Sequence, residues 1–405
     1  MPTEQSLLLL ILLVGLILIA AILIRSGLER FGFPAIIGYI GLGVLLRSAD
    51  QSWQLFSVGD REVWAFLADL GIICLLFRVG LESDFAKLVN QLRRASIIWF
   101  SNIVVSAVFG FFTARWLLQL DLIPSLFVAT AMTATSVSIS VAVWQEAKAL
   151  NSKNGELMLD VAEMDDVSAI AMMALLFALV PVLQNNPEAG WLPVLGKASA
   201  IFAFKTVLFG AFCFLFSRYV EKYLTSFFQR IDSASDPTIT VAAVGFIIAA
   251  IAGFLGFSVA IGAFFAGLAY SYDPRASQID ASFATIYNLF VPFFFLGIGF
   301  SLDLEVLAIA LGWGIILLIA AVLGKVVGVA VPVLILDTRT SALLLGISMV
   351  PRAEIMMIIM QRGLNLGEWA VSSQLFSAMV LVSATTTVVA PLILRRLLAL
   401  QPQTE

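Results

Sequence analysis

Long apolar segments that follow one another are the feature that most constrains the fold of this chain. Of its 405 residues, 61% are hydrophobic and 12% are charged, whereas about 25% of the residues are charged in an ordinary soluble domain. A soluble core of this length does not need so much apolar surface, and roughly 20 consecutive apolar residues cross a bilayer as a helix. The sequence therefore predicts an all-α membrane protein with many spans.

Polar, glycine and proline breaks divide the chain into thirteen apolar segments, each of which we expect to be a transmembrane helix. Segments 34–47 and 256–271 look too short to cross unaided. Segment 6–24 is long for a signal peptide and follows Glu4 rather than a basic residue, so we expect it to be retained. The segments are 6–24, 34–47, 64–83, 95–118, 122–143, 156–184, 191–219, 236–253, 256–271, 283–302, 306–336, 341–361 and 368–396.

Basic residues near the segment ends predict the orientation. With the N-terminus outside, fourteen Lys and Arg fall on the inner side and five on the outer side, and four of the 23 lie within segments. Cytoplasmic loops carry an excess of Lys and Arg. We therefore expect the N-terminus outside and the C-terminus in the cytoplasm.

A weak internal repeat relates the two halves of the chain. At an offset of 224, the matches are Gly32-Phe33, Ile37-Gly38 and Gly43 with Gly256-Phe257, Ile261-Gly262 and Gly267. The stretch Gly80–Asp84 likewise resembles Gly299–Asp303. The second segment then runs outward and the ninth inward, which predicts inverted repeats over 34–184 and 256–396. Many secondary transporters have this architecture, with the site at the midplane; chance similarity of glycine-rich helices is the alternative.

Two segments carry residues that predict a break in the helix. In 122–143, the stretch Thr130–Ser138 has five hydroxyl residues among nine, which suggests unwound backbone. In 341–361, Pro351 lacks a backbone donor and clashes with the preceding turn. Non-helical backbone at membrane depth is tolerated only inside protein or along a wet cavity. One break in each repeat therefore predicts a shared site between them.

Adjacent aspartates, Asp165 and Asp166, lie about ten residues inside segment 156–184. A charge near the bilayer centre costs a few kcal/mol, and such residues usually mark an ion or proton path. About ten helical residues reach the middle of a roughly 30 Å core. Both breaks lie at a similar depth and Lys325 lies slightly deeper, so we expect these four elements to converge.

Lys325 needs a carboxylate, because an unpaired buried charge is strongly destabilising. Asp165 and Asp166 are the candidates. We expect the aspartate that Lys325 holds to stay ionised, and the other to exchange a proton for a cation. Carboxylate, hydroxyl and carbonyl oxygens suit hard cations such as Na⁺, Li⁺ and K⁺.

Other charges within the segments predict structural pairs. Arg352 and Glu354 can neutralise one another or pair with Glu163 or Glu82. Arg78 and Glu82 stand at i and i+4, the spacing of a helical ion pair.

The composition also excludes whole classes of function. The chain has no histidine, and its two cysteines, Cys74 and Cys213, lie far apart in apolar segments. We expect both to be small buried hydrophobes rather than a disulfide or metal site. No nucleophile and base constellation is visible, so the sequence predicts neither an enzyme nor a cofactor, and no nucleic-acid partner.

The chain resembles the membrane domain of bacterial cation:proton antiporters, on the Na⁺/H⁺ antiporter and Kef-type branch. The matching pieces run almost from end to end. They are Gly32–Tyr39, Gly80-Leu81-Glu82, Thr133–Ser136, Asn151–Glu156 leading to Asp165-Asp166, Lys325, and Val350–Glu354.

The resemblance implies a homodimer in the bacterial cell membrane, in which each protomer has a dimerisation domain and a mobile core domain with crossed discontinuous helices. It also implies elevator-like alternating access. By carry-over, Asp166 matches the cation-binding aspartate, and Asp165 matches its neighbour, paired with Lys325. The matching crossover residues are Thr133, Thr135 and Ser136 in the first break and Arg352 and Glu354 in the second.

An Asp-Asp pair with a lysine resembles the electrogenic members, which move two protons per sodium, whereas Kef-like proteins tend to have Gln-Asp. The chain also ends soon after its last segment, without the nucleotide-binding regulatory domain of Kef proteins. We therefore expect a Na⁺ (or Li⁺)/H⁺ antiporter. The alternatives are a K⁺/H⁺ antiporter, a cation-coupled organic-anion symporter and a cation channel, although no repeated filter or continuous polar pore is visible.

Overall fold

The regular structure of the chain is helical in every part that can be described. The computed structural model describes residues 4–31, 33–83, 92–185, 191–220, 223, 227, 237–271, 276–303, 305–401 and 403. Nine helices in this part are long and apolar enough to cross a membrane, and two shorter helices are also apolar. These helices confirm an all-α protein of the membrane class. Gly32 and Asp84, two residues of the predicted repeat, lie outside the described residues.

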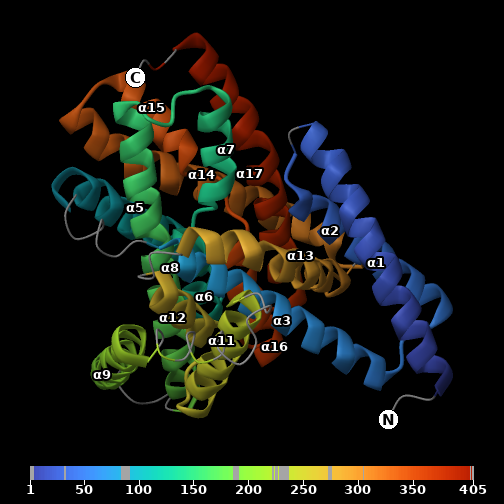
Figure 1. Cartoon of the computed structure of the whole chain (residues 1–405). Coiled ribbons are helices and arrows are strands. Elements are labelled where there is room, and N and C mark those ends of the chain that lie inside the picture. The colour runs from blue at the N-terminus through green and yellow to red at the C-terminus, as the bar shows by residue number, and fades with distance from the viewer. Residues whose placement is uncertain are drawn as a thin grey trace. The chain divides into compact units, whose positions relative to one another are not determined.

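The helices form two units. Unit 1 comprises Met1–Arg30, Gly38–Asp84 and Phe177–Ser301, and unit 2 comprises Phe31–Ile37, Phe85–Leu176 and Leu302–Glu405. Figure 1 shows their helices along the chain. The helices of unit 1 are α1 (Glu4–Arg30), α2 (Ala35–Trp53, from Gly38 on), α3 (Val58–Glu82), α9 (Trp191–Leu215), the π-helix η2 (Phe216–Val220), α11 (Pro237–Phe254), α12 (Val259–Ser271) and α13 (Ala276–Phe300).

Unit 2 contains the elements with the predicted breaks. Its helices are α5 (Leu92–Phe112), the π-helix η1 (Thr113–Leu117), α6 (Leu122–Thr133), α7 (Val137–Glu146), α8 (Lys153–Asn185, as far as Leu176), α14 (Leu307–Leu336), α15 (Arg339–Ser348), α16 (Glu354–Leu366) and α17 (Ser373–Leu400). When the helices of both units are counted, each of the thirteen predicted segments contains one helix or two consecutive helices.

Four helices of unit 1 (α1, α2, α3 and α13) extend beyond the predicted segments by six or seven residues at one end. In α2 and α13 the added polar ends have partners in the fold. The end of α2 includes Asp50, which is buried and accepts hydrogen bonds from Arg61 at 3.0 Å and from the main chain of Phe56 at 3.0 Å. The start of α13 includes Asp280, which lies 2.8 Å from Arg78. The apolar pattern alone underestimates both helices, since a paired charge interrupts hydropathy without interrupting the helix.

Four glycines bring the main chains of neighbouring helices in unit 1 into contact. A Cβ atom at any of them would meet a carbonyl oxygen of the facing helix. The contacts join Gly43 of α2 to Leu296 of α13, Gly299 of α13 to Ile40 of α2, Gly80 of α3 to Phe264 of α12, and Gly267 of α12 to Phe77 of α3. In the predicted repeat, Gly43 is matched with Gly267 and Gly80 with Gly299, so the α2–α13 and α12–α3 contacts join matched positions.

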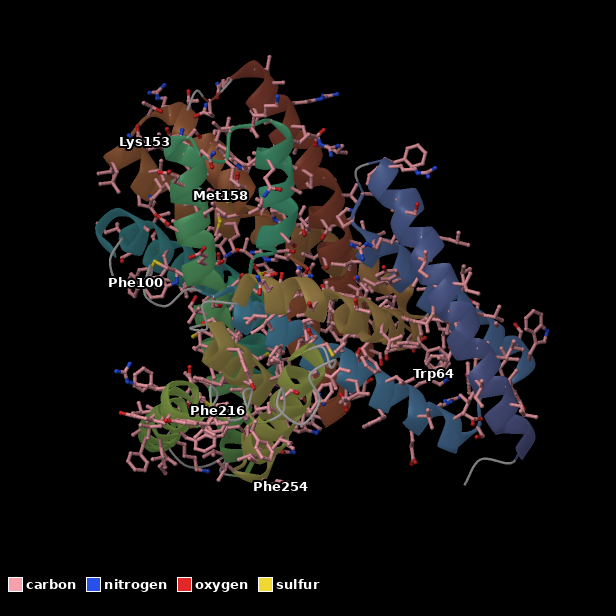
Figure 2. All side chains as sticks on the ribbon, viewed as in Figure 1. Trp64, Phe100, Lys153, Met158, Phe216 and Phe254 are labelled. Carbon is pink, nitrogen blue, oxygen red and sulfur yellow. The ribbon has the colours of Figure 1, made fainter. Side chains whose placement is uncertain are left out.

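Large apolar side chains on the surface of both units fit a lipid environment. The rings of Phe100 in α5 and Phe254 in α11 point away from the ribbon (Figure 2) and are 64% and 91% exposed. Along α1, half of the leucine and isoleucine side chains whose burial is described are exposed. The interior of unit 2 is also apolar, and Met158 of α8 packs there in a cluster with Trp144.

The glycine contacts make a prediction for stability. Gly267→Ala places a Cβ against the Phe77 carbonyl, so α12 and α3 must separate. Overpacking of this kind typically costs about 1–3 kcal/mol, and we expect a lower melting temperature in detergent micelles. Gly15→Ala in α1 is the matched control, because nothing lies within 4 Å of its Cβ position and alanine favours a helix over glycine. Equal melting temperatures for the two variants would contradict the close α3–α12 contact.

Candidate ion-binding site

Both predicted helix breaks are present in unit 2. The first lies at residues 134–136, between α6 and α7, and the second at residues 349–353, between α15 and α16. Ala134 has φ −64° and ψ 145°, an extended conformation that ends α6. Ser136 precedes α7 with φ −92° and ψ 94°. The hydroxyl-rich stretch and Pro351 therefore mark real interruptions.

The two breaks contact each other directly. The main-chain N–H of Ser136 donates to the carbonyl of Pro351 at 2.7 Å. On α7, Ser140 Oγ donates to the Ser348 carbonyl at 2.5 Å, and Trp144 Nε1 donates to Ser348 Oγ at 2.9 Å. Through these bonds α7 contacts the end of α15 at Ser348, while α6 lies against α16. Helix α7 also lies beside α17 (Figure 1). Both halves of the first broken helix therefore contact elements around the second break.

Two buried cations bind the main-chain carbonyls that the first break leaves without helical partners. Lys325 Nζ donates to the Thr133 carbonyl at 2.6 Å, and Arg352 Nη2 donates to the Met132 carbonyl at 2.8 Å. In the second break, Arg352 Nη1 donates to the carbonyl of Val350 at 3.2 Å. The end of a helix leaves four carbonyls unsatisfied, and a buried one needs a donor. These cations therefore stabilise unwound backbone.

Asp165 is the aspartate that Lys325 holds. Lys325 Nζ lies 2.7 Å from Asp165 Oδ2, and both side chains are 0% exposed. Thr135 Oγ1 donates to the same oxygen, and Asn102 Nδ2 donates to Oδ1 at 3.0 Å. Donors from three elements therefore occupy both oxygens, and the choice that the sequence left open is resolved in favour of Asp165.

Asp166 lies in a different environment from its neighbour. Successive side chains on a helix point about 100° apart. Asp166 therefore points in a different direction around the axis of α8 from Asp165, which contacts Lys325. Its side chain is half-buried, whereas that of Asp165 is fully buried. The adjacent carboxylates are therefore distinct in exposure.

Glu354 and the hydroxyls of the first break form a second polar contact. Ser136 Oγ donates to Glu354 Oε2 at 2.8 Å, and Glu354 opens α16, where a helix N-terminus favours a negative charge. Thr133 Oγ1 donates to the Thr130 carbonyl, one turn earlier. Among the described residues, Arg352 donates to main-chain carbonyls at both breaks, and Glu354 accepts from Ser136. The pairing of Arg352 and Glu354 with each other, or with Glu163 or Glu82, stays a prediction.

The accessory charges divide between the two units. In unit 1, Arg78 lies 3.0 Å from Glu82, which confirms the predicted i, i+4 pair, and also 2.8 Å from Asp280, which sequence reasoning missed. Glu163 is half-buried on α8 in unit 2. Cys74 and Cys213 are free and buried, as expected.

Asn102 is the site residue that sequence reasoning did not single out. It lies on α5, about ten residues inside the helix, so the depth argument that found the aspartates applied to it as well. A further contact joins α5 to α8, the helix of Asp165. Trp99 Nε1 donates to Ser168 Oγ at 3.1 Å, and Ser168 Oγ donates to the Asp165 carbonyl at 2.9 Å. The signal in the sequence that could have identified Asn102 was a single amide side chain within an apolar segment.

The chain is similar in sequence to known antiporters. The chain is 28% identical over 382 residues to a Na⁺/H⁺ antiporter of Enterococcus hirae, covering 94% of this chain and 96% of the relative. It is 26% identical over 385 residues to the Na⁺/H⁺-K⁺ antiporter GerN of Bacillus cereus, covering 94% of each.

The fold is also similar to a solved structure. The sodium proton antiporter MjNhaP1 of Methanocaldococcus jannaschii matches with a TM-score of 0.70 and 15% identity, over 99% of this chain and all of that chain. The family described as the sodium/hydrogen exchanger, transmembrane, matches residues 14–400. This match extends over nearly the whole sequence, and the chain belongs to the sodium/hydrogen exchanger family.

Proposed function

We propose that this cation/proton antiporter exchanges Na⁺, or Li⁺, for H⁺, and that Asp166 is the carboxylate for which the two ions compete. A carboxylate that binds either a proton or a cation exchanges them whenever the empty, charged site cannot cross the membrane. The oxygen ligands near the breaks suit hard monovalent cations. The cation is a substrate in this proposal, and no resident cofactor is needed.

The different surroundings of the two aspartates carry the proposal. Asp165 has a donor on each oxygen and an ammonium group at 2.7 Å. Its carboxyl group is therefore already engaged by partners within the protein. Asp166 is half-buried beside it, which leaves it the better placed of the two to meet an ion from water. Thr133, Thr135 and Ser136 add oxygens at the same break.

The choice of cation rests on the relatives. One is named for Na⁺/H⁺ exchange and another for Na⁺/H⁺-K⁺ exchange. The second name makes K⁺ the other candidate. Na⁺ is preferred because both names contain it and because an Asp-Asp pair with a lysine departs from the Kef-like pattern.

An elevator mechanism in a homodimer fits the division into units. Unit 2 contains both breaks and the buried charges, so it can serve as the core domain that carries the ion across the membrane. Unit 1 is held together by the reciprocal glycine contacts, which suit a static dimerisation domain. Those contacts also support inverted repeats over 34–184 and 256–396. The excess of Lys and Arg on one side of the predicted spans supports an N-terminus outside and a C-terminus in the cytoplasm, in a bacterial cell membrane.

Asp166→Asn tests the exchange site. In proteoliposomes with an imposed pH gradient, Na⁺, Li⁺ or K⁺ is added outside and the lumenal pH is followed by a fluorescent dye. We expect the wild type to dissipate the gradient with Na⁺ or Li⁺. In Asp166→Asn the dissipation should fall to the level of empty vesicles, because an amide does not bind and release a proton as a carboxyl group does. Glu156→Gln, at the exposed start of α8, is the matched control and should behave as the wild type.

The outcomes separate the parts of the proposal. If Asp166→Asn still dissipates the gradient with Na⁺, the site assignment is wrong. A response of the wild type to K⁺ alone would replace Na⁺ by K⁺. No response to any cation would refute antiport by this chain.

Lys325→Gln leaves Asp165 charged and buried. Breaking a buried pair typically costs about 3–5 kcal/mol, so we expect a clear fall in the melting temperature and in exchange. Asp165→Asn should also destabilise, and the double variant should recover part of the loss, since no unpaired charge remains. Lys153→Gln is the control, because Lys153 is 67% exposed in its pair with Asp337 and such surface pairs contribute about 0–1 kcal/mol. Equal melting temperatures for Lys325→Gln and Lys153→Gln would contradict the energetic role of the buried pair.

Electrogenic exchange makes the rate depend on membrane potential. With two protons moved per Na⁺, one net charge crosses, which is worth about 2.3 kcal/mol at 100 mV. We expect exchange in proteoliposomes to change several-fold when valinomycin and K⁺ set opposite potentials. Equal rates at both potentials would show electroneutral exchange.

A further inference from the structure

Asn102 is a buried amide in the middle of an otherwise apolar helix. Its side chain is 0% exposed, and its Nδ2 donates to Asp165 Oδ1 at 3.0 Å. Close packing of α5 on α14 brings it there, because a Cβ on Gly328 would lie only 2.9 Å from the Asn102 Cα. Asn102 therefore reaches the carboxylate from a helix that carries none of the predicted site residues.

The donors to Asp165 are unequally shared between its oxygens. Lys325 and Thr135 both bind Oδ2, while Asn102 is the donor to Oδ1. A neutral amide thus holds one oxygen independently of the ammonium group that holds the other. If Lys325 shifted, Oδ1 would still be bound.

The amide carries a cost that packing alone does not explain. Asn102 Oδ1 is buried and has no hydrogen-bond partner among the described residues, and burying an unsatisfied acceptor is unfavourable. Leucine at this position would fill a similar volume without that cost. The benefit must lie in the donor, which faces a carboxylate, where a charge-assisted hydrogen bond is stronger than a neutral one.

We propose that Asn102 is a positioning residue for the exchange reaction. It holds the Asp165 carboxyl group against Lys325, so that Asp166, the next residue of α8, is presented as the group that exchanges the proton. This inference rests on the proposed function. The charge of Asp165 orients the amide in return, because the reversed amide would direct Oδ1 at a carboxylate oxygen.

Other charged groups lie close to this contact. Asp166 follows Asp165 on α8, and Lys325 reaches Asp165 from α14. The Arg352 guanidinium interacts electrostatically with both Asp165 and Lys325. A test of Asn102 must therefore change its donor without changing its volume. Asn102→Asp does so, since the two side chains have the same shape.

The pH profile of exchange by Asn102→Asp is the main test. A protonated carboxyl at position 102 donates to Asp165 as the amide does, whereas an ionised one repels it. We expect near wild-type exchange on the acid side and loss on the alkaline side, which moves the alkaline limit down by about one pH unit or more. The melting temperature of this variant should fall as the pH rises, and that of the wild type should change less over the same range.

Two further variants separate positioning from packing. Asn102→Leu keeps the volume and removes the donor, and we expect its maximal exchange rate to fall roughly tenfold or more at every pH. Ser106→Ala is the matched control: Ser106 lies one turn further on α5, is 1% exposed, faces Gly324, and its hydroxyl has no hydrogen-bond partner among the described residues. This variant should exchange as the wild type does.

Each outcome bears on a defined part of the inference. An Asn102→Asp variant with the wild-type pH profiles of exchange and melting overturns the positioning role, and so does wild-type exchange by Asn102→Leu. Equal losses in Ser106→Ala and Asn102→Leu would assign the effect to packing and overturn it as well. If the wild type exchanges no cation, the proposed function fails, and the melting profile of Asn102→Asp still reports on the contact with Asp165.

Discussion

The buried ion pair between Lys325 and Asp165 is the interaction on which the rest of unit 2 depends. Removing two charges from water costs several kcal/mol for each ion unless good geometry and further hydrogen bonds compensate. Here both conditions are met, because Lys325 also binds the Thr133 carbonyl and Asp165 also accepts from Asn102 and Thr135. One ammonium group thereby joins α14 to α8 and to the end of α6. The first helix break is tolerated because this contact supplies a donor where the helix stops.

The same principle arranges the charges around both breaks. The carbonyl end of α6 meets the cations Lys325 and Arg352, and the amino end of α16 begins with the carboxyl group of Glu354, which accepts from Ser136 at the start of α7. Cations near a helix C-terminus and anions near an N-terminus are each stabilised by the helix dipole. The broken helices therefore create partial charges within unit 2, and the buried side chains neutralise them. Charges that look unfavourable in the sequence are matched to backbone groups exposed by the breaks.

The pattern of the sequence was enough to locate the helices, both breaks and the buried charges Asp165, Lys325 and Arg352, because each leaves a one-dimensional signal. It did not locate the ends of α2 and α13 or the buried Asp50. Partners were harder to predict. Asp165 and Asp166 are adjacent, and only the rotation of α8 about its axis decides which of them faces Lys325. Arg352 stands two residues from Glu354, which suggested a pair, yet unwound carbonyls compete for its guanidinium. Asn102 escaped notice because a single amide carries no charge, and its role depends on how closely α5 approaches α14.

The three-element clamp on Asp165 has a consequence for its neighbour. The position of Asp166 is determined by the hydrogen bonds of Asp165, which hold α8 at this level. Sliding or turning α8 at this level would break contacts with α5, α14 and the first break together. The proposed exchange carboxylate can therefore bind either a proton or a cation while its position in unit 2 stays the same. An attempt to alter the preferred cation can redesign the oxygens around Asp166 while leaving its anchoring intact.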